Sequence, residues 1–136
     1  MDMFPKKKRS EIMAAVRSTH NKLTETKLVE IFRRHGIRGW RRHLLLPGKP
    51  DFTFRQQRVV IFVDGCFWHG CAKHLRMPVN NRVYWNEKIS RNMIRDRMTT
   101  LRLRKEGWKV VRIWEHELHR ESMVLKRVAK ALGPNE

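Results

Sequence analysis

The residues with the greatest chemical capacity are concentrated in one segment, residues 63–74, which reads Val-Asp-Gly-Cys-Phe-Trp-His-Gly-Cys-Ala-Lys-His. Cys66, Cys71 and His74 have a Cys-x4-Cys-x2-His spacing, which offers three ligands for zinc. The segment has few apolar residues that could hold it in place, so a bound metal would have a structural role. The pattern therefore predicts a structural zinc site; the competing interpretation is a pair of buried or redox-active thiols.

A tetrahedral structural zinc site needs a fourth ligand, which must come from outside this segment. His116 follows a predicted strand that ends at Trp114. If that strand neighbours the predicted strand at residues 59–63, both strand ends emerge on the same side of the sheet, and His116 reaches the zinc loop. We therefore expect His116 as the fourth ligand, with His119 as the alternative.

Three more side chains of the segment could act on a substrate. His69 could be a further metal ligand, a packing residue, or a general base with a pKa near neutrality. Phe67 and Trp68 are adjacent large aromatic residues, which cannot easily both point into a core. They could stack on bases or wedge between them, or they could form an apolar lid over the sheet.

Acidic residues near two predicted strands suggest a second metal site. Pro50-Asp51 precedes one strand and Asp64 ends the next, as in the metal-binding half of a restriction-like nuclease core. There, carboxylates hold Mg²⁺, which polarises the phosphate and activates water. The acid-x-Lys that usually follows is missing here, and Pro50-Asp51 alone also fits a simple turn. On the long predicted helix, Asn92 and Asp96 share a face, where Asp96 could aim at the active site or pair with arginines.

Hydrophobic periodicity and turn residues predict the elements that must position these side chains. The predicted elements are a basic flexible arm (1–9), a short helix after Ser10, a helix from Thr24 to Gly36, strands at 40–46, 51–54 and 59–63, a long helix at 83–106, a strand at 108–114 and a last helix at 118–132. Gln56-Gln57 is a candidate hairpin turn, and the long helix is expected to place Trp85, Ile89, Met93 and Leu101 near one face. The order favours an α/β fold with a mixed sheet flanked by helices.

Composition limits the chain to one domain, residues 1–136, with 40% apolar residues to form a core. Its 31 Lys and Arg against 13 Asp and Glu give a net charge of +18, which predicts a polyanionic partner. Nucleic acid is the first candidate and an anionic membrane surface is the rival. The sequence has no spanning apolar run, no secretory signal and only two cysteines, so we expect a cytoplasmic, reduced protein.

Four stretches together resemble the very-short-patch repair (Vsr) DNA mismatch endonuclease family. They are 46–51 (Leu-Pro-Gly-Lys-Pro-Asp), 61–69 (Ile-Phe-Val-Asp-Gly-Cys-Phe-Trp-His), 84–96 with Tyr84-Trp85 and Asn92-x2-Arg95-Asp96, and 107–115 with Gly107-Trp108 and Trp114-Glu115. The resemblance implies a restriction-endonuclease-like fold with a structural zinc. It also implies a Mg²⁺-dependent nick immediately 5′ of the thymine in a T·G mismatch left by deamination of 5-methylcytosine, which initiates very-short-patch repair.

The resemblance also implies roles for individual residues. Asp51 matches the aspartate that binds the catalytic Mg²⁺, Val63 the residue that adds its backbone carbonyl, and His69 the general base. The residues that match those supporting the site are Glu25, Asp96 and Asn92. The residues that match DNA contacts are the wedging aromatics Phe67, Trp68 and Trp85 and, in the N-terminal helix that enters from the minor groove, Met13 and Val16. The basic arm adds Lys6, Lys7, Lys8 and Arg9 as expected DNA contacts.

Two positions depart from the family pattern. Asp64 stands where some members carry a histidine, so it could be a metal ligand or could orient the base. The last zinc ligand matches His116 rather than a cysteine, which gives a chemically sound Cys2His2 set.

The expected partner is double-stranded DNA with a mismatch, and by resemblance a MutL-type mismatch-repair factor. We expect a monomer that acts on the bacterial nucleoid. The rival functions are a nicking endonuclease with another mismatch or sequence specificity, and a zinc-stabilised DNA-binding module without cleavage. Asp51, His69 and Asp96 argue against the second, because binding alone requires no acids facing a polyanion.

Overall fold

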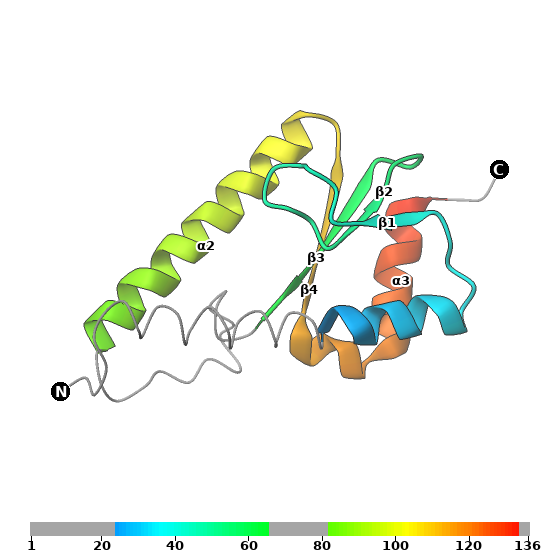
Figure 1. The fold of residues 1–136 in the computed structure, drawn as a ribbon, viewed down its shortest axis with the longest axis horizontal. Helices are drawn as coiled ribbons and strands as arrows, with labels where there is room; N and C mark the ends of the chain where they lie inside the picture. The colour runs from blue at the N-terminus through cyan, green and yellow to red at the C-terminus, as the bar shows by residue number, and fades with distance from the viewer. Residues whose placement is uncertain (1–23, 66–81, 134–136) are drawn as a thin grey trace.

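The computed structural model describes residues 24–65 and 82–133 (Figure 1). The described elements are a helix at residues 24–34, β1 (Trp40–Arg42), β2 (Phe52–Phe54), β3 (Val59–Asp64), α2 (Arg82–Lys105), β4 (Lys109–Trp114), the 3-10 helix η1 (Glu115–His119) and α3 (Glu121–Leu132). They form a mixed sheet with helices on both faces, which confirms the predicted α/β architecture. Within residues 24–65 and 82–133, no helix combines the length and the hydrophobicity that spanning a bilayer requires.

The sheet has the strand order β1-β2-β3-β4. β2 pairs antiparallel with both β1 and β3, so the predicted turn at Gln56–Gln57 does close a hairpin. β3 and β4 are parallel and in register from Val59 opposite Lys109 to Asp64 opposite Trp114. The two parallel strands therefore end side by side, which meets the condition set for His116, and residues that follow them emerge at one edge of the sheet.

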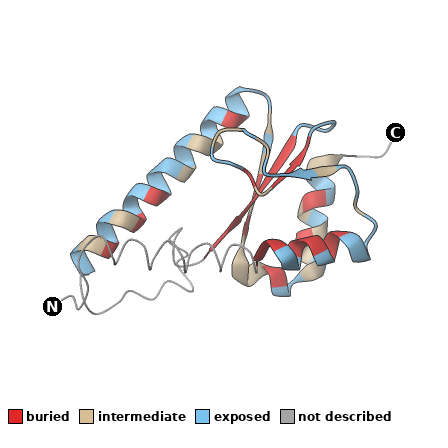
Figure 2. Ribbon diagram, viewed as in Figure 1, coloured by how far each residue is buried: buried red, intermediate tan, exposed pale blue. Residues whose placement is uncertain are grey.

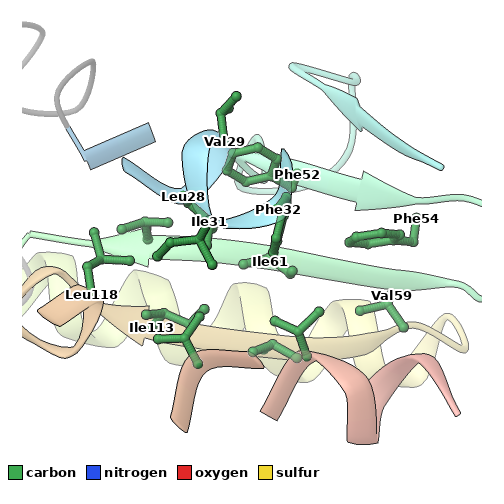
Figure 3. Close-up of a cluster of buried hydrophobic side chains, with 14 residues drawn as sticks. Leu28, Val29, Ile31, Phe32, Phe52, Phe54, Val59, Ile61, Ile113 and Leu118 are labelled. Carbon is green, nitrogen blue, oxygen red and sulfur yellow. The ribbon is translucent and has the colours of Figure 1, made fainter. Parts of the chain in front are cut away.

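The main core lies on the sheet face that is covered by the helix at residues 24–34 and by α3. Phe32 is fully buried there and meets Phe52 edge-on, with ring centroids 5.4 Å apart. Figure 3 shows Phe32 beside the strand side chains Phe52 and Ile61. The other face carries Val60 and Phe62, which pack with Leu103 of α2 into a smaller cluster.

α2 contacts the sheet through a narrower stripe than its apolar residues suggest, and most of its surface is exposed (Figure 2). Its buried residues are Trp85, Ile89, Asn92 and Leu103. Met93 and Leu101, expected on this face, are 41% and 59% exposed. At about 3.6 residues per turn, Leu101 lies roughly 160° around the helix from Trp85, whereas Asn92 and Asp96 lie within the stripe. The middle of the inward face is therefore polar.

Two elements depart from their predicted ranges by more than two residues. β1 ends at Arg42, because His43 has a φ of 57° and leaves the extended conformation. The last predicted helix is split into η1 and α3 at Arg120. The Glu117 carboxylate accepts a hydrogen bond from the backbone N–H of Trp114 at 2.9 Å, and this bond closes a tight turn at the end of β4.

Replacing Phe32 tests the main core. Phe32→Ala removes the ring that meets Phe52 and Phe54 edge-on, and we expect it to lower the free energy of unfolding by about 3–5 kcal/mol. Leu45→Ala is the control, because Leu45 is 94% exposed and its loss should cost less than about 0.5 kcal/mol. Equilibrium unfolding in urea measures both, and equal effects of the two variants would contradict this packing.

Candidate active site

The local backbone positions Asp51 beside the end of β3. The N–H of Asp51 donates to the carbonyl of Ile61 at 3.0 Å, which extends the β2–β3 ladder by one residue. The preceding residue, Pro50, has no N–H, so the ladder cannot continue in that direction. Gly48 lets this loop approach α2, because its φ is +75° and a Cβ there would lie 2.4 Å from the Thr99 side chain.

The Asp51 side chain supplies a hydrogen-bond acceptor for β3 where the backbone ladder with β2 ends. Beyond Ile61, the edge of β3 that faces β2 has no strand partner among the described residues. The N–H of Val63 donates instead to Asp51 Oδ2 at 2.7 Å. Because the N–H and C=O of one residue in an extended strand project from the same edge, the Val63 carbonyl belongs to the edge where Asp51 lies.

Glu25 adds a second carboxyl group from the helix at residues 24–34. Its side chain is buried and hydrogen-bonds that of Asp51. Arg42 donates from Nη2 to Glu25 Oε2, and His43 Nε2 lies 3.8 Å from the same oxygen. The end of β1 therefore supplies the Arg42 cation and the His43 imidazole to Glu25, and Glu25 in turn contacts Asp51.

Burial raises the pKa of Asp51 from 3.8 to about 7. The hydrogen bond from the Val63 N–H opposes this effect, whereas the hydrogen bond and the charge of Glu25, and the charge of Asp64, add to it. Close acidic groups that resist ionisation together can ionise when a cation arrives. The arrangement thus favours a divalent cation at Asp51.

Asp64 ends β3 and forms an ion pair with an arginine from the neighbouring strand. Arg112 Nη1 donates to Asp64 Oδ1 at 2.9 Å and to Oδ2 at 3.1 Å. In the parallel register Arg112 stands opposite Phe62, so it reaches two residues along β3 on the same face. Only 5% of Asp64 is exposed, and Arg112 balances its charge.

Arg112 also ties α2 to this end of the sheet. Its Nε donates to Thr100 Oγ1 at 2.9 Å and its Nη2 to the backbone carbonyl of Asp96 at 3.2 Å. Asn92, one turn earlier on α2, is buried and accepts a hydrogen bond from Arg95 at 2.9 Å. The structure thus brings Asp96 to Asp64 through Arg112, and Asn92 to the same stripe of the helix.

Among the three neighbouring acids, Asp51 differs in its charge environment. Glu25 pairs with Arg42, and Asp64 pairs with Arg112. In the described part of the chain, Asp51 has hydrogen-bond partners but forms no ion pair with an arginine or lysine. Mg²⁺ commonly binds through one or two carboxylates, with waters and substrate phosphates filling its other positions. Asp51 with an adjacent backbone carbonyl fits that requirement.

Comparisons with known proteins identify the family of the chain. The family model for the DNA mismatch endonuclease Vsr matches residues 1–75, more than half of the chain. The DNA mismatch endonuclease Vsr of Escherichia coli (strain K12) is 36% identical over 115 residues, which cover 84% of this chain and 73% of that enzyme.

The chain belongs to the Vsr family of DNA mismatch endonucleases.

The chain is accordingly a DNA endonuclease, and DNA is its substrate. Other Vsr relatives are named as nicking enzymes. The type II nicking enzyme V.NaeI of Lentzea aerocolonigenes is 49% identical over 69 residues, 51% of this chain and 42% of that enzyme. V.NmeAIP of Neisseria meningitidis serogroup A is 33% identical over 129 residues, 93% of this chain and 91% of the enzyme.

Several predicted site residues lie outside the described ranges. They are His69, the zinc candidates Cys66, Cys71 and His74, and the DNA-contact candidates Phe67, Trp68, Met13, Val16, Lys6, Lys7, Lys8 and Arg9. His116 and His119 lie in η1, directly after the end of β4. Within the two described ranges, no three histidine, cysteine or acidic side chains form a metal site by themselves. Zinc therefore stays a prediction.

Trp85, a predicted wedge residue, lies near the N-terminus of α2. It is only 5% exposed, and its ring meets that of Tyr84 edge-on at 5.0 Å between centroids. A wedging role would therefore require the ring to leave this position when DNA binds.

Sequence reasoning missed the two arginines that pair with the acids, Arg42 and Arg112. A signal for Arg112 exists in the strand pattern, because an arginine alternates there with the buried residues Val111 and Ile113. Alternation places Arg112 on the face that α2 covers, where a cation needs an anionic partner.

The raised pKa of Asp51 predicts an inverse dependence of stability on pH. Between about pH 4 and 7 the folded chain holds the proton more tightly than the unfolded chain, so stability falls as pH rises. Asp51→Asn should remove this loss and be more stable than wild type at pH 8 by about 2–4 kcal/mol.

Urea unfolding at pH 4.5–8 with a chelator present measures that difference. The control is Glu30→Gln, which removes an exposed acid from the helix at residues 24–34. If Asp51→Asn and wild type keep the same stability difference at every pH, the pKa of Asp51 is not raised.

Proposed function

We propose that this Vsr-family chain is a Mg²⁺-dependent endonuclease that nicks one DNA strand 5′ of the thymine in a T·G mismatch. Such mismatches arise by deamination of 5-methylcytosine, and the nick would initiate very-short-patch repair. The observation that carries the proposal is the acidic group of Asp51, Glu25 and Asp64 inside a chain of net charge +18. Acids that face a DNA phosphate are useful only where a cation lies between them.

Asp51 and the backbone carbonyl of Val63 would hold the Mg²⁺ ion. When bound, the ion would supply Lewis-acid polarisation of the scissile phosphate and compensation of the charge that develops there. The Val63 N–H fixes one oxygen of Asp51, so the carboxylate is oriented before substrate arrives. Glu25 would restrain the Asp51 side chain from the helix at residues 24–34, and its charge would add to the attraction for a cation once Asp51 is ionised.

His69 would act as the general base that takes a proton from the attacking water. It follows Asp64 by five residues, and Asp64 is held by Arg112 at the end of β3. Asn92 and Asp96 would support the site from α2, where both lie in the inward stripe.

Mismatch preference would come from aromatic residues that enter the duplex. Phe67, Trp68 and Trp85 would wedge beside the mismatch, where a wobble pair gives up its stacking more easily than a matched pair. Met13 and Val16 would approach from the minor groove. The basic arm, Lys6 to Arg9, would contact phosphates without regard to sequence.

Zinc at Cys66, Cys71, His74 and His116, with His119 as the alternative fourth ligand, would hold the loop that carries His69 and Trp68. The parallel ends of β3 and β4 support this set, because η1 follows β4 at the edge where the loop leaves β3. We further propose that the enzyme acts as a monomer and works with a MutL-type repair factor.

A second specificity is favoured by the relatives named type II nicking enzymes. In that case the same site would nick at a different mismatch or sequence. A panel of matched and singly mismatched duplexes with Mg²⁺ separates the two, since fastest nicking at T·G supports the main proposal and fastest nicking elsewhere supports the alternative.

Removing the Asp51 carboxylate tests the chemistry. Asp51→Asn should slow nicking of T·G duplex by more than about 100-fold, because even groups that only orient a metal ligand typically contribute 10–100-fold. Duplex affinity should stay the same or rise, since no phosphate donor is lost. Glu25→Gln should slow nicking less, and Glu30→Gln on the exposed face of the same helix should be neutral. Nicking by Asp51→Asn at the wild-type rate would place the active site elsewhere.

A paired measurement tests the wedge. Trp68→Ala should lower nicking of T·G duplex far more than it weakens binding to matched duplex, because stacking is worth about 1–3 kcal/mol per base and non-specific binding depends on charge. Both quantities are measured at one salt concentration. A fall of both by the same factor would contradict the wedge.

Metal analysis tests the zinc site. The purified protein should contain about one zinc per chain, and Cys71→Ser should lose the metal and unfold at lower denaturant, since structural zinc contributes folding free energy directly. A stable wild type that lacks zinc would rule the site out.

A further inference from the structure

Arg112 makes more polar contacts to the candidate active site than its place in a buried strand requires. One guanidinium group contacts both carboxylate oxygens of Asp64, the hydroxyl of Thr100 and the backbone carbonyl of Asp96. It also lies over the Phe62 ring, 4.2 Å from the centroid. β3, β4 and α2 therefore meet at this one side chain, which is only 22% exposed.

The charge of Asp64 matters beyond this pair. Asp64 follows Val63, whose N–H holds Asp51, and the charge of Asp64 acts on the Asp51 carboxyl group. Arg112 balances that charge with a two-point contact, whereas Asp51 has no such arginine among the described residues. The ion pair with Arg112 thus compensates the charge of Asp64, whereas the carboxyl group of Asp51 stays available to a cation.

We propose that Arg112 is a positioning residue of the active site: it withdraws Asp64 from cation binding, so that the cation is directed to Asp51, and it fixes α2 against the end of β3. The inference rests on the proposed function in taking Asp51 as the cation ligand. Arg112 itself touches neither cation nor substrate. It acts through the charge of Asp64 and through the position of α2.

This role makes opposite predictions for the two members of the pair. Arg112→Gln removes the positive charge that pairs with Asp64 and so makes the surroundings of Asp51 more negative, and a divalent cation should bind more tightly. Asp64→Asn leaves an uncompensated guanidinium there, so a cation should bind more weakly. In the double variant both charges are absent, and cation affinity should return close to the wild-type value.

The probe is Mn²⁺, whose binding to the protein without DNA is followed by the loss of the free-ion signal in electron paramagnetic resonance. We expect Arg112→Gln to tighten Mn²⁺ binding at least about 5-fold and Asp64→Asn to weaken it at least about 5-fold, as one added or removed charge within a few Å of a divalent ion should do. The double variant should lie within about 2-fold of wild type. Arg58→Gln is the matched control, because Arg58 also covers an aromatic ring and donates to a backbone carbonyl, but at the opposite end of β3.

Two results would overturn the proposal. If Asp64 were itself a metal ligand, the double variant would bind Mn²⁺ as weakly as Asp64→Asn. If Arg112 only stabilised the fold, Arg112→Gln would lower the free energy of unfolding and leave Mn²⁺ affinity unchanged, as Arg58→Gln should.

Arg112→Lys keeps the test decisive if Arg112→Gln does not fold. Lysine preserves the charge but not the fork that reaches Thr100 and Asp96. Mn²⁺ affinity should therefore stay within about 2-fold of wild type, while kcat for nicking falls at least about 10-fold with little change in KM for the duplex. A changed Mn²⁺ affinity with an unchanged kcat would contradict the proposal. Because the Mn²⁺ measurement needs no cleavage, a failure of the proposed nicking activity would be seen separately.

Discussion

The hydrogen bond from the Val63 N–H to Asp51 is the contact on which the rest of the candidate site depends. It exists because β2 begins one residue after Asp51 and, within residues 24–65 and 82–133, the edge of β3 beyond Ile61 has no strand partner. A buried N–H without an acceptor is costly, so the carboxylate that satisfies it is held firmly. The same contact brings an acid next to a free strand edge, which is where a backbone carbonyl can join it in holding a cation.

Electrostatic interactions explain why Asp51, and not Glu25 or Asp64, is available to bind a cation. A chain with 18 excess positive charges can neutralise acids easily, and it does so for Glu25 through Arg42 and for Asp64 through Arg112. Asp51 lies between them with a raised pKa and no paired arginine in the described ranges. The net positive charge attracts DNA, and the acidic group of Asp51, Glu25 and Asp64 is where a metal ion would contact the scissile phosphate.

Much of this organisation follows from sequence. The β-branched run of β3, the glycine after α2 and the Pro-Asp turn located three elements to within a few residues. The family resemblance pointed to Asp51 and Glu25, and Asp64 was singled out by its place at the end of a predicted strand, with its role left open. On α2, Trp85 and Ile89 lie on the inward face as predicted, but Met93 and Leu101 do not, because the stripe carries Asn92 and Asp96 in its middle. The pairing of Arg112 with Asp64 does not follow from sequence, because the two residues are 48 positions apart and only the parallel register of β3 and β4 brings them together.

The central claim is that a divalent cation binds at Asp51 and displaces its proton. Calorimetric titration of the protein with Mg²⁺ in buffers of different ionisation enthalpy measures the protons released per ion bound. With a pKa of about 7, Asp51 should release about half a proton per ion at pH 7 and close to none at pH 9, and Asp51→Asn should release none. Mg²⁺ binding without proton release at pH 7, or with the same release in Asp51→Asn, would contradict the account.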